Sequence, residues 1–212
     1  MKKTRHQTEL EKLEKEFRDY FENQDHSREQ SLRLAREVIR LSSRAIKKMH
    51  QGDFEDSRKL LEQATSLLIS ARQSVIKFPE IQYAGFLHNA EKELIEALVL
   101  YRILKEKTIF IPDFKAFDRI SFLHGLSEAM GELRRNILDR MRKNETGELE
   151  DMLSLMDDIY YFLNSFDYPD VLTRGLRRSV DVFRSVVEKT RADVTLILQQ
   201  KSLEKKLQKN GL

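Results

Sequence analysis

Residues 176–197, LRRSVDVFRSVVEKTRADVTLI, show most clearly how this chain folds. Apolar or small side chains recur in this stretch at alternating steps of four and three residues. The positions are Leu176, Val180, Phe183, Val187, Thr190, Val194 and Ile197. This spacing places them along one side of an α-helix, as in a coiled-coil seam. The stripe can pack inside its own bundle, and it can also meet another subunit. The pattern leaves both interpretations open.

The same helical periodicity continues along almost the whole chain and predicts a single all-α domain over residues 1–212. Seven helices are expected, over residues 1–26, 27–52, 54–78, 80–107, 119–143, 152–166 and 176–200. The break between the first two rests on the polar run Asn23–His26, followed by Ser27 and Gln30, which could form a capping box. The Lys-rich tail, residues 201–212, is expected to fray.

The composition excludes several other classes of protein. Seven glycines and three prolines in 212 residues are too few for the many turns of sandwiches, barrels or propellers. Cysteine is absent, which excludes disulfides, a thiol nucleophile and cysteine-based zinc sites. The longest stretch without a charged residue, Ile81–Ala90, is half the roughly 20 residues that span a bilayer. The N-terminal sequence does not resemble a secretory signal. A cytoplasmic protein that does not cross a membrane is therefore expected.

Basic side chains gather on one face of the second predicted helix. This basic ridge consists of Arg33, Arg36, Arg40, Arg44 and Lys47, which fall within about 80° of one another around the helix axis. Planar guanidinium groups suit phosphate oxygens, so the ridge could bind a nucleic acid. A solvated basic face is the commoner meaning of such a pattern. No aromatic residues interleave with the ridge, so base stacking is not supported there. The net charge of +3 is too small to identify a partner.

Carboxylates recur at helical spacing on two other predicted helices. Glu93 and Glu96 lie three residues apart at the edge of an apolar face, and Glu128 and Glu132 lie four apart. Periodicity alone places the second pair on a solvated face, opposite the apolar stripe of its helix. Four such carboxylates would suit Mg²⁺ or Mn²⁺, which prefer oxygen ligands, and a bound cation could promote cleavage of a phosphodiester.

Spacing alone leaves this metal site a weak hypothesis. The Glu-x-x-His motifs of ferritin-like metal sites are absent, as are a glycine-rich phosphate loop and a nucleophile elbow. His124 stands four residues before Glu128, but an isolated histidine is more often a hydrogen-bonding or surface residue than a ligand.

Two stretches resemble a known family. Lys77-Phe78-Pro79, followed by Gln82-Tyr83 and Phe86, resembles the translin branch of the translin/Trax family. Residues 122–133, FLHGLSEAMGEL, resemble the signature on that family's fifth helix. The likeness runs from about Ser27 to Leu198, and the order and separation of the motifs make it fairly specific.

The resemblance implies a catalytic site. Trax is the catalytic member of an endoribonuclease complex, in which acidic residues on two helices bind Mg²⁺ and hydrolyse single-stranded RNA. Its first pair matches Glu93 and Glu96, and its second matches Glu128 and Glu132, so all four are implied as catalytic and metal-binding residues. Translin lacks carboxylates at the first pair, which places this chain on the catalytic side.

The chain also departs from the family pattern at two places. Trax has Asp where this chain has Glu128, which moves the ligand oxygen by about one methylene and puts the metal geometry there in doubt. The family's Arg-Gly motif near the end of the last helix is missing, and Arg191-Ala192-Asp193 stands nearby instead.

The resemblance further implies a closed, hollow homo-octamer that binds RNA on its inner surface. The carboxylates and the basic ridge would then face a water-filled interior. One chain acting as both RNA scaffold and nuclease would suit a prokaryotic or archaeal homologue. The expected partner is single-stranded RNA, with short duplex RNA or DNA as alternatives. Two other functions stay open: a non-catalytic RNA- or DNA-binding oligomer of the translin type, and a helical scaffold without a nucleic-acid role.

Overall fold

A computed structural model describes residues 4–209 and contains only helices, turns and loops within that range. The helices are α1 (Arg5–His50), α2 (Phe54–Ser74), α3 (Pro79–Gln82), α4 (Gly85–Tyr101), the π-helical turn η1 (Arg102–Glu106), α5 (Arg119–Arg142), α6 (Leu149–Asn164), α7 (Asp170–Thr173) and α8 (Leu176–Lys209). The all-α prediction is therefore confirmed.

The first two predicted helices form one continuous helix, α1, so the predicted break at Asn23–His26 is wrong. Polar residues alone do not end a helix, and this segment contains neither glycine nor proline. The side-chain amide of Asn23 instead donates to the backbone carbonyl of Asp19 at 2.6 Å. The capping box lies at the start of α1, where the Thr4 hydroxyl accepts from the Gln7 amide at 3.3 Å.

Two other predicted boundaries also differ. The predicted fourth helix is divided into α3, α4 and η1. The last helix continues past Gln200 to Lys209, so the segment expected to fray is helical in the described residues. Lys201 anchors the extension because its ammonium donates to the Asn144 carbonyl at 2.7 Å. The outer ends of the predicted segments 1–26 and 201–212, residues 1–3 and 210–212, lie outside the described residues.

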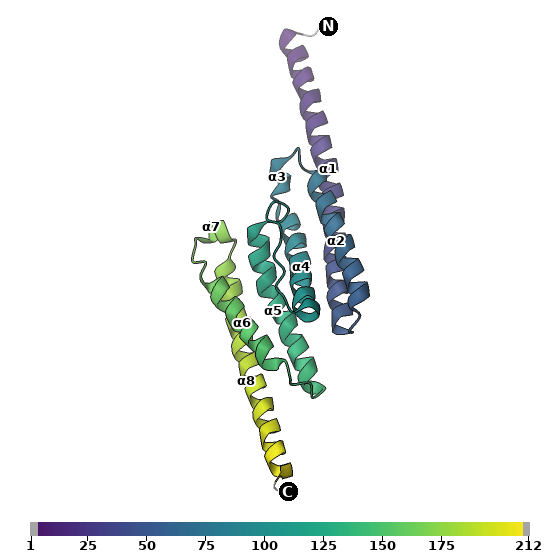
Figure 1. Cartoon of the computed structure of the whole chain (residues 1–212). Helices are drawn as coiled ribbons and strands as arrows, with labels where there is room; N and C mark the ends of the chain where they lie inside the picture. The colour runs from purple at the N-terminus through teal and green to yellow at the C-terminus, as the bar shows by residue number, and fades with distance from the viewer. Residues whose placement is uncertain (1–3, 210–212) are drawn as a thin grey trace.

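The helices form three adjacent pairs, α1 with α2, α4 with α5, and α6 with α8 (Figure 1). The central pair contributes much of the core, including Leu94, Leu100, Leu133 and Ile137, which are all buried. On α8 the residues of the opening stripe from Leu176 to Val194 are buried in this bundle, which confirms their intramolecular role.

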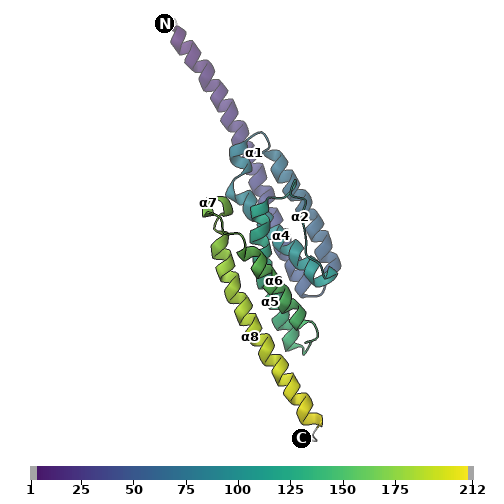
Figure 2. The ribbon, with the colours of Figure 1, turned by 60° about the vertical axis from the view of Figure 1, so that its left-hand side comes forward.

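The ends of the two longest helices project beyond the bundle in opposite directions (Figures 1 and 2). The N-terminal part of α1 carries exposed apolar side chains, including Leu10, Phe17 and Phe21. None of the helices within residues 4–209 combines the length and the hydrophobicity needed to cross a bilayer.

Candidate functional site

Helices α4 and α5 approach each other closely at Gly125. A Cβ atom placed on Gly125 would lie 2.7 Å from the backbone oxygen of Lys92 and 2.8 Å from Cγ2 of Ile95. Only glycine allows this separation without a shift of one helix. Glu93 and Glu96 lie beside this contact on α4, and Glu128 lies one turn further along α5. Because Gly125 has no side chain, the two helices pack closely enough for their carboxylates to come together.

Three of the four predicted site residues converge across this contact. Glu93, Glu96 and Glu128 each offer a carboxylate oxygen, and these oxygens all lie within 4.8 Å of one another. We call these three residues the acidic cluster. The longer side chain at position 128 still reaches it. The ligand set consists only of oxygens, which fits Mg²⁺ or Mn²⁺ better than zinc.

Negative charge is concentrated in the acidic cluster beyond what the protein neutralises. Burial, together with the charges of the neighbouring carboxylates, raises the pKa of Glu96 to about 8. At neutral pH the Glu96 carboxyl is therefore largely protonated unless a cation joins the cluster. A divalent cation would favour the ionised form, so the electrostatics of these residues fit the metal that the resemblance implies.

Lys92 provides an internal positive charge at the same place. Its ammonium nitrogen lies 2.7 Å from the carboxylate of Glu128 and 3.7 Å from that of Glu93. The Lys92 side chain is mostly buried. It therefore neutralises part of the acidic cluster and would compete with a metal for Glu128.

Glu132 lies next to the acidic cluster but turns toward α1. Its carboxylate oxygen is 2.6 Å from Nε2 of His50 and 3.6 Å from Arg135. The hydrogen bond with His50 is the main reason why the pKa of Glu132 is lowered. The predicted four-carboxylate site is thus three converging carboxylates with the fourth held by a histidine.

Glu128 and Glu132, which periodicity places on a solvated face, are partly exposed. Their side chains are only 39% and 27% exposed, because α4 and the end of α1 pack beside that face of α5. The periodicity of one helix could not reveal this, because α5 is packed on several sides and includes the buried polar residues Ser121 and Ser127.

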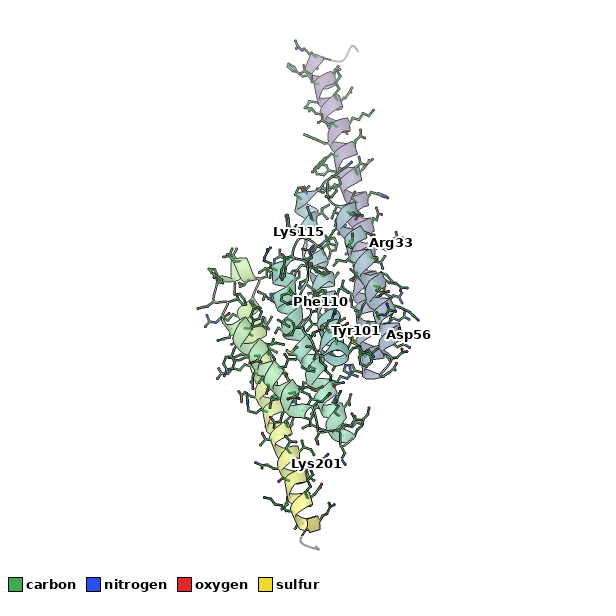
Figure 3. The ribbon with its side chains drawn as sticks, in the orientation of Figure 1. Arg33, Asp56, Tyr101, Phe110, Lys115 and Lys201 are labelled. Atoms are coloured by element: carbon green, nitrogen blue, oxygen red, sulfur yellow. The ribbon has the colours of Figure 1, made fainter. Side chains whose placement is uncertain are left out.

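The basic ridge on α1 is exposed along its whole length. Its members are Arg33, which Figure 3 labels, Arg36, Arg40, Arg44 and Lys47. Of these five, only Arg40 forms an ion pair with a described residue, Glu37. The ridge ends one turn before His50, which contacts Glu132. The basic ridge therefore leads along α1 toward the acidic cluster.

Sequence reasoning missed His50 and Lys92, because their partners lie 82 and 36 residues away and no local spacing links them. The interpretation of His124 as a hydrogen-bonding residue is confirmed. Its Nε2 lies 3.0 Å from the Thr173 carbonyl and its Nδ1 lies 3.1 Å from the Ser179 hydroxyl. Burial lowers the pKa of His124.

Comparison with solved structures places this architecture in a family. The chain is similar to AfC3PO in a complex with duplex RNA, at 30% identity and a TM-score of 0.82, over 88% of this chain and 96% of that one. AfC3PO is a translin/Trax-type protein. The chain belongs to the translin/Trax family. The predicted membership and the predicted translin-type fold are thereby confirmed.

The chain is also similar to two further solved structures and to one further protein. A crystal structure of AfC3PO gives the same identity and TM-score, over 97% of that chain. Apo-NeC3PO, at 22% identity and a TM-score of 0.72 over 89% of this chain and 96% of that one, shares the fold. An uncharacterised protein of Methanocaldococcus jannaschii is 36% identical over 194 residues, which cover 90% of this chain and 85% of that protein. No family model matches the chain.

Proposed function

We propose that this protein is a metal-dependent endoribonuclease that cuts single-stranded RNA inside a hollow homo-oligomer, as its family resemblance implies. The observation that carries the proposal is the convergence of Glu93, Glu96 and Glu128, whose carboxylate oxygens lie within 4.8 Å of one another. A non-catalytic binding protein has no need to concentrate three carboxylates, one of them with a pKa near 8, at one helix contact.

Different residues of the chain would bind the metal, orient the site and bind the RNA strand. Glu93, Glu96 and Glu128 would hold Mg²⁺ or Mn²⁺, which would supply Lewis-acid activation of the phosphodiester. His50 keeps the Glu132 carboxylate oriented beside them. The exposed arginines of the basic ridge bind the phosphates of the strand, and α1 leads that strand toward the acidic cluster. An octamer would enclose these surfaces in one interior.

The proposal is tested by cleavage of an end-labelled single-stranded RNA with Mg²⁺, Mn²⁺ or EDTA. We expect cleavage only with a metal and a loss of at least about 100-fold in Glu128→Gln and in Glu132→Ala. The matched control is Glu150→Gln, which removes an exposed carboxylate of α6. Full activity of either site variant, or cleavage in EDTA, would contradict the assignment. Native mass spectrometry of the same samples would test the octamer.

A second candidate is a non-catalytic RNA-binding oligomer, which the pairing of Lys92 with Glu128 favours because that carboxylate already has a positive partner. This candidate predicts tight binding of RNA without cleavage in either metal. A duplex arm belongs in the same assay, because the similar AfC3PO is described in complex with duplex RNA. Cleavage of duplex RNA alone would change the proposed substrate from single-stranded to duplex RNA, while the proposed nuclease activity would stand.

A further inference from the structure

A cavity of about 480 Å³ lies beyond the acidic cluster, at the other end of the contact between α4 and α5. It is open to solvent and is lined mainly by the junction of α3 and α4, the loop before α5, and the first turn of α5. Lys115, labelled in Figure 3, marks that loop. On α4, His88 of the cavity lies one turn before Lys92, which is about 6 Å along the axis. On α5, Ser121 lies two turns before Glu128, about 10 Å away.

Both acidic groups of this cavity are held by hydrogen bonds in its wall. Glu91 is buried, accepts from the guanidinium of Arg72 at 2.6 Å and accepts from the backbone amide of Asp118 at 2.8 Å. Asp118 accepts from the amide of Ser121 at 2.9 Å and lies 3.6 Å from Nδ1 of His88. The hydrogen-bonding environment of Asp118, with His88 as the main cause, holds its pKa below the ordinary range.

The cavity also holds basic groups beyond Arg72, which is paired with Glu91, and the charge of one of them, Arg174, helps to lower the pKa of Asp118. Lys115, Arg119 and Arg174 also line it, and none of them forms an ion pair with a carboxylate among residues 4–209. All three side chains belong to exposed residues. The cavity therefore carries a surplus of positive charge, which would attract a phosphate group.

Aromatic rings complete the lining. Tyr83, at the end of α3, is 73% exposed and has its ring available for stacking. Phe114 and Phe117, in the loop before α5, also line the cavity, and the guanidinium of Arg119 lies 5.3 Å from the ring centre of Phe114. Aromatic rings and arginine planes are the surfaces on which unpaired bases stack.

Phosphate-binding cations and stacking surfaces in one cavity are complementary to a nucleotide. We infer that this cavity binds one unpaired nucleotide of the RNA strand that crosses the acidic cluster, with its phosphate at Arg119 and Arg174 and its base against Tyr83. The inference rests on the proposed function, because it takes RNA as the ligand. A base inside a duplex cannot enter such a cavity without leaving its stack.

The experiment uses the full-length protein and a ten-nucleotide oligouridylate that carries 5-iodouridine at one position. Calcium replaces the catalytic metal so that binding is measured without cleavage. Irradiation is expected to crosslink the RNA to Tyr83 or Phe114, as mapped by peptide mass spectrometry. Affinity is expected to fall about tenfold in Tyr83→Ala and in the double variant Arg119→Gln, Arg174→Gln.

The matched control is Arg178→Gln, which removes an exposed charge four residues from Arg174 but outside the cavity. Its affinity should stay within about twofold of the original protein. Unchanged affinity in both cavity variants, or crosslinks only on α1, would overturn the inference even if the protein cleaves RNA. Crosslinking at Tyr83 without cleavage in any metal would support nucleotide binding in the cavity and contradict the proposed nuclease activity.

Discussion

The ammonium of Lys92 lies 2.7 Å from the carboxylate of Glu128, across the contact between α4 and α5. The same nitrogen is 3.7 Å from Glu93, so the single charge of Lys92 is shared between two members of the acidic cluster. The lysine side chain is held within the site rather than extended into solvent. Metal binding and the Lys92 ion pair must therefore compete for the same carboxylate oxygens.

Lys92→Met should raise the affinity for Mn²⁺ by about tenfold, because a competing positive charge is removed from the cluster. The metal-free protein should become less stable by about 1 kcal/mol, because the carboxylates then repel one another without compensation. Calorimetric titration and urea unfolding measure the two effects. Lys189→Met, which alters an exposed lysine of α8, is the control. Weaker Mn²⁺ binding by Lys92→Met would show that the lysine supports the site instead.

Gly125→Ala should separate α4 from α5, because the added Cβ would meet the Lys92 carbonyl at 2.7 Å. We expect a loss of about 1–3 kcal/mol in the free energy of unfolding and weaker Mn²⁺ binding. Gly131→Ala is the matched control on the same helix, where a Cβ meets nothing within 4 Å. That control should be stabilised by about 0.5–1 kcal/mol. Equal behaviour of the two variants in urea unfolding would refute the close-contact argument.

Stability without metal should fall as the pH rises from about 4.5 to about 8. The pKa of Glu96 is about 8 in the folded protein because of burial and neighbouring carboxylates, against 4.5 for an ordinary glutamate. The folded state therefore holds more protons than the unfolded chain within this window, which makes the slope negative. The loss should be on the order of 2 kcal/mol after allowance for solvent screening.

Glu96→Gln isolates this contribution, because the amide does not titrate. Its urea-unfolding free energy in EDTA should vary less with pH than that of the original protein. Added Mn²⁺ should restore stability to the original protein above neutral pH, and less so to Glu96→Gln. An identical pH slope in both proteins would contradict the assigned cause.

Arg36→Gln with Arg44→Gln should weaken RNA binding and reduce its dependence on salt. Both arginines are exposed and neither forms an ion pair with a described residue. For a single strand, the slope of log affinity against log salt should fall by about 0.7 for each arginine that no longer binds a phosphate. Fluorescence anisotropy over a salt series measures the slope, with Arg177→Gln on α8 as the control. A slope that does not change would remove the basic ridge from the binding surface.

The helices could be predicted from the sequence because apolar side chains repeat locally, as from Leu176 to Val194. The pairs Glu93 with Glu96 and Glu128 with Glu132 could also be found, since their spacing and the likeness of residues 122–133 to translin/Trax are contained in the chain. The convergence of Glu93, Glu96 and Glu128 could not be predicted from the sequence, because it depends on how closely α4 and α5 pack at Gly125.

The sequence also did not predict that His50 and Lys92 contact the carboxylates of the site. His50 meets Glu132 only because α1 packs on α4 and its last turn reaches α5, and no local pattern records a contact between residues so far apart. The mistaken break at Asn23–His26 has a different origin. Polar residues that favour helix ends are also tolerated inside a helix, and the absence of glycine and proline was the stronger signal.

The continuity of α1 also determines the direction in which its projecting end presents side chains. Its 46 residues form a rod about 69 Å long without a hinge between the free part and the part that packs on α2. The directions in which Leu10 and Phe17 point around the helix axis are thus fixed relative to that of the buried residue Val38. Insertion or deletion of one residue between positions 17 and 27 would rotate the exposed apolar side by about 100° relative to the bundle. Only a change in length that corresponds to a nearly whole number of helical turns would preserve its direction.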